Sequence, residues 1–407
     1  MGGNTLGVLG SDVKVGLSDG TKIAYANLDY AASAPCLREV ADVVGELLPY
    51  YASVHRGAGA LSQLCTEKYE LARESVTTFL GCRPDDEVVF TRNTTDALNL
   101  LAHVVPPDTA VITFEGEHHA NLLPWNDVIR LPAPSSPEEA VSAVAETLAV
   151  LGTWRPALLA VTGASNVTGE VWPLAELAAV ARRSGARIAV DAAQLAPHRR
   201  IDVAALGLDY VAFSGHKLYA PFGTGVLAGR ADWLDRARPY LAGGGATAHV
   251  GDAPGQVDWA IGAARHEAGS PNVIGAVALA AACDALAAAD LDAIRSEEDS
   301  LTTRLHDGLA EIPAVRVLGA GGRWPDKLGI VSFTVDGVET RTVSTRLAAE
   351  FGIGVRDGLF CAHPFTRRLL EQTGATAPTA VRASIGIGTT KEHVDRLITG
   401  IRLIAGS

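Results

Sequence analysis

The sequence predicts an α/β fold, in which a large domain built on a doubly wound, mostly parallel sheet is followed by a smaller α/β domain. Of the 407 residues 48% are hydrophobic and only 20% are charged, so the chain can bury a large core. Strand-like and helix-like stretches alternate throughout the first half. Two short apolar stretches also end abruptly on polar residues, at Asp191 and at Ser214.

We expect three parts along the chain. Residues 1–24 are rich in glycine and polar side chains, which predicts an N-terminal arm that packs with the small domain. Residues 25–272 form the large domain and residues 273–407 the small C-terminal domain. The large domain should contain a helix at 61–80, a strand at 87–92, a helix at 97–103, a strand at 111–114, a helix ending near 151, and strands at 157–161, 186–194 and 210–213. The small domain should begin with an alanine-rich helix from 273, followed by a strand at 327–334 and a helix at 340–351.

Composition limits the kinds of partner. A net charge of −12 and a pI near 5.4 provide no basic surface for nucleic acid or for an anionic membrane, so we expect a small molecule and other proteins as partners. The five cysteines are scattered, which argues against a disulfide framework and a zinc site and favours the cytoplasm. No charged start precedes an apolar run, and Cys283-Asp284 interrupts the apolar stretch 273–289, so we expect a soluble protein.

Lys217 and Asp191 carry the first chemical prediction. Lys217 follows the apolar stretch 210–213; a lysine on a surface loop is the alternative, but an apolar neighbourhood would lower its pKa and let the free amine attack a carbonyl carbon. Asp191 ends the preceding apolar stretch, one helix-sized crossover upstream, so both residues can lie at the carboxyl ends of neighbouring parallel strands. Pyridoxal phosphate needs this arrangement: a lysine for a Schiff base and a carboxylate beside the pyridine nitrogen.

Thr94 and Thr95 stand where the predicted helix at 97–103 begins. Hydroxyl side chains at a helix start can simply cap it. The same position offers backbone N–H groups and the positive end of the helix dipole to an anion, so we expect the two threonines to hold the cofactor phosphate.

Three segments resemble those of a known family. Val190-Asp-Ala-Ala-Gln194, Phe213-Ser-Gly-His-Lys217 and Arg382-Ala-Ser384 are similar to the class V branch of the fold type I pyridoxal-phosphate enzymes. More narrowly, they resemble the cysteine desulfurase and selenocysteine lyase family, in its group II-like form, and the likeness runs from about Tyr25 to Leu403. The resemblance implies a fold type I transferase whose large domain binds pyridoxal 5'-phosphate.

The resemblance also implies roles for single residues. His118 would stack on the pyridine ring and move protons, whereas His119 beside it has a structural role; Asn166 would contact the phenolic oxygen of the cofactor and the substrate, unless it is only a turn residue. Further cofactor contacts are implied for Gln194, Ser214, His216 and Ser270. Ser270 stands where the family usually has a threonine that contacts the phosphate of the neighbouring subunit, which implies a homodimer.

The same resemblance implies which residues bind the substrate and accept its sulfur. Arg382, with Arg356, would bind the substrate carboxylate, and Cys361 matches the sulfur-accepting cysteine. The segments 25–35 and 51–59, the second with His55 and Arg56, resemble stretches that border the active site. The expected activity is removal of sulfur from L-cysteine, or of selenium from selenocysteine, with release of alanine, a persulfide on Cys361 and a possible sulfur-acceptor protein.

Two departures from the family pattern leave other activities open. Leu359-Phe360 replace the histidines that often precede the cysteine, which makes its surroundings more apolar, and Ala246-Thr-Ala-His-Val250 does not match the family closely. A pyridoxal-phosphate-dependent C–S β-lyase, a racemase or an epimerase is the alternative within the cofactor class. A non-catalytic scaffold is the alternative outside it.

Overall fold

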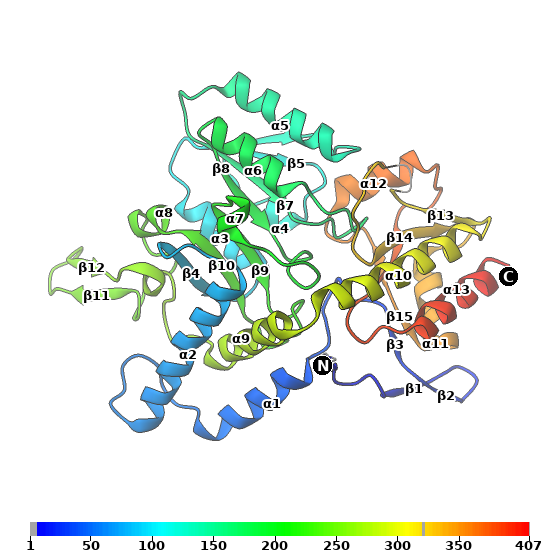
Figure 1. The fold of residues 1–407 in the computed structure, drawn as a ribbon, viewed down its shortest axis with the longest axis horizontal. Coiled ribbons are helices and arrows are strands. Elements are labelled where there is room, and N and C mark those ends of the chain that lie inside the picture. The colour runs from blue at the N-terminus through cyan, green and yellow to red at the C-terminus, as the bar shows by residue number, and fades with distance from the viewer. Residues whose placement is uncertain (1–5, 320–321, 407) are drawn as a thin grey trace.

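The computed structural model describes residues 6–319 and 322–406. Its centre is a seven-stranded sheet (Figure 1). The strand order is β4 (Asp86–Thr91), β10 (Gly225–Arg230), β9 (Tyr210–Ser214), β8 (Arg187–Asp191), β7 (Ala157–Thr162), β5 (Ala110–Phe114) and β6 (Val128–Leu131). Only β10 runs against its neighbours, and every other pair in the sheet is parallel. The predicted mostly parallel sheet is therefore confirmed.

Helices cover both faces of this sheet, because alternate strand residues point to opposite sides. Val211 and Phe213 belong to a core that also contains residues of α1, α2, α5, α6 and α9, whereas Ala212 belongs to a second core with residues of α3 and α8. The helices are α1 (Arg38–Leu47), α2 (Ala60–Phe79), α3 (Thr94–Val104), α4 (His119–Leu122), α5 (Pro137–Leu151), α6 (Leu174–Arg183), α7 (Val203–Leu206), α8 (Ala231–Arg236) and α9 (Val273–Ala288). Two 3-10 helices, η1 (Leu48–Tyr50) and η2 (Gly262–Arg265), and a hairpin of β11 (Thr247–Val250) and β12 (Val257–Trp259) complete this region; the hairpin projects from the body at the left of Figure 1.

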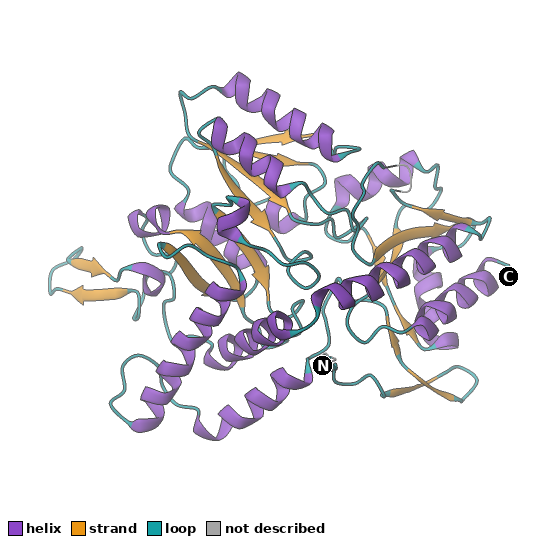
Figure 2. Cartoon of the chain, viewed as in Figure 1, coloured by secondary structure: helices purple, strands orange, loops and turns teal. Residues whose placement is uncertain are grey.

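A smaller, antiparallel sheet follows α9 and α10 (Leu291–Ala310) (Figure 2). Its order is β13 (Val315–Val317), β14 (Ile330–Val335), β17 (Ala380–Ser384) and β16 (Arg356–Gly358). Its core includes residues of α10, α11 (Thr340–Phe351) and α13 (Lys391–Ala405), while α12 (His363–Gln372) follows β16. The strand expected at 327–334 begins at Ile330, because Lys327 forms an isolated bridge with Glu170.

The N-terminal region lies against this smaller sheet. A hairpin of β1 (Lys14–Gly16) and β2 (Lys22–Ala24) is joined to α11 through Ser18 N, which donates to Ala349 O. The next strand, β3 (Ala26–Asn27), pairs in parallel with β15 (Ile353–Gly354). The exact domain boundaries stay a prediction.

Helix α9 is apolar apart from Asp284, and ten of its residues are buried. Within residues 6–319 and 322–406, no single helix has the length and hydropathy needed to cross a membrane. The pair α9 and α10, bent by 89°, meets that test only when the two helices are taken together.

Candidate active site

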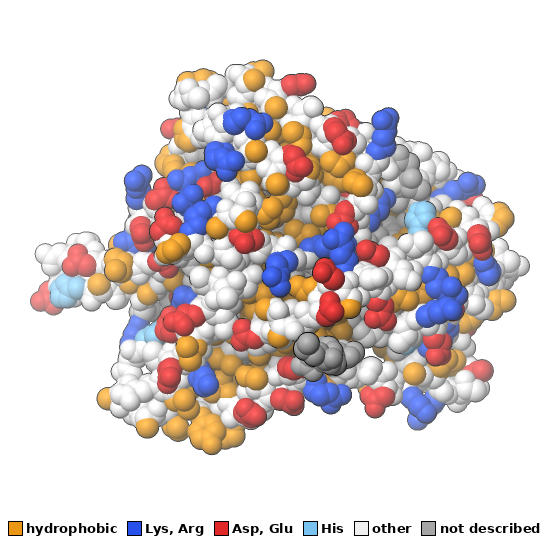
Figure 3. All heavy atoms as spheres, in the orientation of Figure 1, with side chains coloured by type: hydrophobic (Ala, Val, Ile, Leu, Met, Phe, Trp, Pro, Cys, Tyr) orange, Lys and Arg blue, Asp and Glu red, His pale blue; other side chains and the backbone are white. Residues whose placement is uncertain are grey.

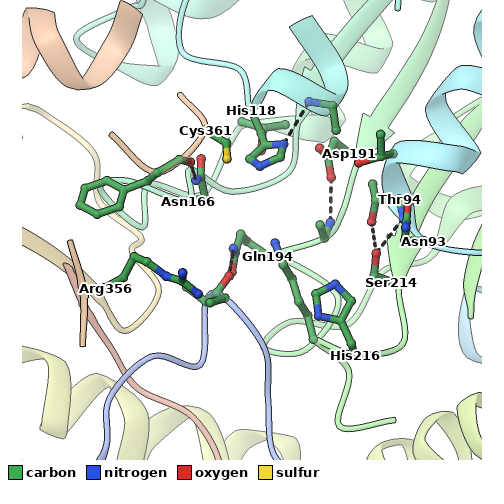
Figure 4. Close-up of a pocket in the computed structure, with 18 of the residues that line it drawn as sticks. Asn93, Thr94, His118, Asn166, Asp191, Gln194, Ser214, His216, Arg356 and Cys361 are labelled. Carbon is green, nitrogen blue, oxygen red and sulfur yellow. Dashed lines mark hydrogen bonds between the residues drawn. The ribbon is translucent and has the colours of Figure 1, made fainter. Parts of the chain in front are cut away.

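A cavity of about 660 Å³ opens at the carboxyl ends of the parallel strands, where α/β sheets place their ligands. Every predicted site residue except Ser270 lines it (Figure 4). These residues are Thr94, Thr95, His118, Asn166, Asp191, Gln194, Ser214, His216, Lys217, Arg356, Cys361 and Arg382. Folding thus brings together residues that are almost 290 positions apart in the chain.

Lys217 and Asp191 lie on neighbouring parallel strands, as their spacing predicted. Asp191 is the last residue of β8, and Lys217 follows the end of β9. Lys217 faces the cavity deep in the protein, and burial lowers its pKa to about 8, although the nearby Asp191 opposes the shift. Burial raises the pKa of Asp191, whose Oδ1 accepts a hydrogen bond from Ala193 N at 3.0 Å. A protonated ring nitrogen is the kind of partner that would offset the burial of this carboxylate.

The start of α3 faces the end of β9. Thr94 N donates to Ser214 Oγ at 2.7 Å, and Thr94 Oγ1 lies 2.6 Å from the same oxygen. Asn93, and not either threonine, caps the helix, because its Oδ1 accepts from Asp96 N at 3.0 Å. The threonine hydroxyls therefore have no capping role: that of Thr94 is hydrogen-bonded to Ser214, and the Thr95 side chain is exposed.

Glycine at position 225 allows this part of the cavity to form. A Cβ atom on Gly225 would lie 2.5 Å from Asn93 Cα, closer than backbone and side chain can approach. Only glycine lets β10 pass beside the first turn of α3, where hydroxyl groups and a helix N-terminus converge. This set of neutral donors and the helix dipole fit a phosphate group.

His118 is held in a defined tautomer. It caps α4, and its Nδ1 accepts from Ala120 N at 3.0 Å, so the ring proton of the neutral form is on Nε2. Burial, followed by the charge of Lys217, lowers the pKa of His118 to about 3. The imidazole is thus neutral near pH 7, as expected of a ring that packs flat on a cofactor.

Glu117 is a site feature that the sequence analysis missed. Its carboxyl group is fully buried, Oε1 accepts from Thr162 N at 3.0 Å, and Oε2 accepts from Asn121 Nδ2 at 2.8 Å. Thr162 pairs in register with Asp191, so Glu117 lies behind the cavity wall. The only signal in the sequence is its position next to His118, which does not reveal burial.

Arg382 lines the cavity from the smaller sheet. It is 3% exposed on β17, its Nη1 donates to Asn166 O at 2.9 Å, and its Nη2 lies 3.3 Å from Asp29 Oδ1. Burial lowers the pKa of Arg382 to about 10, while Asp29 opposes the shift. Asp29 was not predicted as a site residue.

Cys361 is exposed and lies in a tightly held loop between β16 and α12. Phe360 and Cys361 have φ angles of 52° and 54°, which non-glycine residues seldom adopt. Two hydrogen bonds hold this conformation: Asn166 Nδ2 donates to Phe360 O, and His119 N donates to Cys361 O, each at 2.7 Å. Figure 4 shows the thiol on the same side of the cavity as His118 and Asn166.

The loop at 25–35 forms another part of the cavity wall. Gln194 Nε2 donates to Ala31 O at 2.8 Å, and Ala31 and Ala32 line the cavity. His216 Nδ1 lies 3.4 Å from Ser33 Oγ, so a second predicted cofactor residue contacts the same loop.

Ser270 lies in a different cavity, of about 1000 Å³. His55 and Arg56 also line that cavity, and none of its lining residues lines the first one. Within one chain, the structure therefore separates Ser270 from the other predicted cofactor residues. The predicted contact of Ser270 requires a second subunit.

The chain matches known proteins over nearly its whole length. The aminotransferase class-V family model matches residues 26–397. A cysteine desulfurase from Escherichia coli O127:H6 is 37% identical over 398 residues, which cover 95% of this chain and 94% of that protein. One from Pectobacterium atrosepticum is 36% identical over 400 residues, with the same coverage.

Solved structures agree with these sequence matches. The apo cysteine desulfurase from Thermococcus onnurineus NA1 superposes with a TM-score of 0.83 at 32% identity, over 94% of this chain and 95% of that one. A cysteine desulfurase from Escherichia coli gives a TM-score of 0.79 at 34% identity, over 93% and 94%. The chain belongs to the aminotransferase class-V family. This membership indicates a pyridoxal-phosphate-dependent enzyme of fold type I, and it confirms the resemblance drawn from the three sequence segments.

Proposed function

We propose that this chain is a cysteine desulfurase, which transfers the sulfur of L-cysteine to Cys361 and releases L-alanine. The observation that carries the proposal is an exposed thiol in the same cavity as a lysine of lowered pKa and a buried arginine. The similarity to cysteine desulfurases over 95% of the chain supports it.

The residues fit pyridoxal phosphate. Thr94, Thr95, Ser214 and His216 would hold its phosphate end, His118 would cover one ring face, and Asp191 would pair with the ring nitrogen. When bound, the cofactor supplies an electron sink for the substrate carbon.

The side chains of this protein account for the remaining steps. Arg382 would orient the substrate through its carboxylate, and the Lys217 amine can accept and return the Cα proton because its pKa is about 8. The Cys361 thiolate would attack the substrate sulfur. A bond then forms between the two sulfur atoms, the bond from that sulfur to Cβ breaks, and a proton on Cβ completes alanine. One cysteine and one thiol give one alanine and one persulfide, so no other reactant is needed.

A homodimer would complete the site. Large hydrophobic side chains are exposed where α1 ends and α2 begins, and Figure 3 shows hydrophobic atoms gathered at the lower edge over the end of α1. These side chains are Leu48, Tyr50, Tyr51 and Leu61, which are 45% to 57% exposed. A second copy packed on this surface would bury them and would supply Ser270 to the neighbouring phosphate site.

The test compares Cys361→Ser with Cys82→Ser after incubation with L-cysteine. Cys82 is a matched control, because burial raises the pKa of its thiol to about 12 and makes it inert. We expect Cys361→Ser to keep its visible cofactor absorbance but to lose alanine formation and the added sulfur that mass spectrometry finds on the Cys361 peptide. If Cys361→Ser still consumes cysteine at the parental rate, or the wild type releases pyruvate and ammonia, the β-lyase alternative replaces the proposal.

A further inference from the structure

The turn that carries Cys361 has an unfavourable backbone conformation for its residues. Ala362 N donates to Leu359 O at 3.0 Å, which closes a turn of four residues. Its two central residues, Phe360 and Cys361, both have positive φ angles, as in a type I′ turn. Such turns favour glycine and asparagine, because other side chains crowd the backbone in the left-handed region. Contacts from outside the turn must therefore hold this conformation.

Both central carbonyl groups of the turn accept a hydrogen bond from outside it. His119 N donates to Cys361 O, and Asn166 Nδ2 donates to Phe360 O, each at 2.7 Å. The donor at position 119 is a backbone group, which any residue except proline would supply. The donor at position 166 is a side chain, so a substitution of Asn166 can remove its contribution to the turn.

Asn166 lies in a loop that the rest of the protein holds in place. Ser165 N donates to Glu170 O at 2.9 Å, Gly169 N donates to Ser165 O at 3.0 Å, and Leu328 N donates to Gly169 O at 2.7 Å. A Cβ atom on Gly169 would lie 2.5 Å from Leu328 O, so this close approach requires glycine. Asn166 is itself buried. Its amide is therefore a fixed donor and not a mobile surface group.

The backbone and the side chain of Asn166 contact different parts of the cavity wall. The backbone oxygen accepts from Arg382 Nη1 at 2.9 Å, whereas the side chain binds the turn at Phe360. A substitution of the side chain leaves the backbone contact to Arg382 in place. An amide nitrogen also carries two hydrogens, so its bond to Phe360 O does not exclude the cofactor contact that the family resemblance implies.

We propose that Asn166 is a positioning residue for the sulfur-accepting thiol, because its amide holds the turn in the conformation that directs Cys361 into the cavity. Figure 4 shows Asn166 and the thiol on the same side of the cavity. The proposal rests on the proposed function, in which Cys361 attacks the substrate sulfur. Without the amide, the turn would relax toward negative φ angles and would change the direction of the Cys361 side chain.

The first measurement follows the turn itself in the holoenzyme without substrate. Hydrogen exchange of the peptide that contains Ala362, read by mass spectrometry, reports how often the bond from Ala362 N to Leu359 O opens. We expect Asn166→Ala to speed this exchange about fivefold, because the turn loses one hydrogen bond. Asn99→Ala is the matched control and should leave the exchange unchanged. It removes an exposed amide that donates to Thr95 O at 2.8 Å, away from the turn.

The second measurement separates the thiol from the cofactor and the substrate. Exchange of the Cα proton of L-alanine with solvent deuterium, followed by NMR on the holoenzyme, needs Lys217 and Arg382 but no thiol. Persulfide formation from L-cysteine, followed by mass spectrometry, needs Cys361 as well. At saturating amino acid we expect Asn166→Ala to lower the persulfide rate about tenfold relative to the proton-exchange rate. A role of Asn166 in cofactor or substrate binding alone would lower both rates equally.

An unchanged ratio of the two rates in a folded Asn166→Ala protein overturns the proposal, and so does unchanged hydrogen exchange. If that variant does not fold, Asn166→Asp provides a side chain of the same size, which has no donor when it is ionised. The ratio should then fall about tenfold at pH 8, and an unchanged ratio overturns the proposal. If the wild type exchanges the Cα proton of L-alanine but forms no persulfide from L-cysteine, the proposed function itself fails.

Discussion

Replacing Glu117 by Gln should change how the stability of this protein depends on pH. Burial raises the pKa of Glu117 to about 8, even though Asn121 Nδ2 and Thr162 N donate hydrogen bonds to the carboxyl group, and the nearby Asp191 raises it further. The folded chain therefore keeps a proton that the unfolded chain releases near the ordinary value of 4.5.

The sign and size of the effect follow from this difference. Stability from Glu117 is complete below pH 4.5 and is lost as the pH rises toward 8, because the unfolded state binds fewer protons in that window. The loss is about 1.4 kcal/mol for each pH unit, which amounts to about 3 kcal/mol at pH 7 and about 5 kcal/mol at pH 8.

Glutamine can take the place of the neutral acid. Asn121 Oδ1 is buried without a partner among the described residues. Rotation of the Asn121 amide would turn this oxygen toward position 117, where a protonated Glu117 or the Gln amide can donate to it. The variant should thus keep both contacts and lose only the ionisation.

Urea unfolding between pH 5 and pH 8, with both proteins in the same cofactor state, measures the prediction. The two free energies of unfolding should agree within about 1 kcal/mol at pH 5, and Glu117→Gln should be more stable by about 4 to 5 kcal/mol at pH 8. Glu146→Gln, at an exposed position in α5, is the control and should parallel the wild type. Parallel curves for the wild type and Glu117→Gln would refute a neutral, buried Glu117.

Two further variants probe the cofactor end. Lys217→Ala should abolish alanine formation and leave the far-ultraviolet circular dichroism unchanged, because Lys217 is the only lysine among the described residues that line the cavity. The exposed Lys68→Ala is its control, and full activity in Lys217→Ala would exclude the assignment. Asp191→Ala should fold and bind substrate but should lose most of its kcat, since an unprotonated pyridine ring is a poor electron sink; near-normal kcat would count against the pairing.

The sequence allowed prediction of those parts of the site that depend on local pattern. Asp191 ends one short buried strand and Lys217 follows the next, and a parallel crossover places the ends of such strands side by side. The start of α3 was also predictable, although the capping side chain is Asn93 and the threonines are free of that role.

Other features depend on tertiary pairing that no local pattern contains. The register that sets Arg356 opposite Arg382 joins segments separated by α12, and Asp29 reaches them from the far end of the chain. The burial of Glu117 depends on Thr162 and Asn121, which come from different elements. Ser270 belongs to another cavity, and no pattern within one chain tells which subunit it would serve.

In the sequence, the apolar pair Leu359-Phe360 left open whether the neighbouring Cys361 thiol is reactive. In the structure Phe360 is 8% exposed and its ring lies over the Arg382 guanidinium, whereas Cys361 is exposed. The left-handed backbone at both positions separates these environments, because it turns consecutive side chains to different surroundings. The aromatic ring thus supports the arginine that would hold the substrate, and the thiol keeps access to solvent. The departure from the family pattern is therefore compatible with a nucleophilic Cys361.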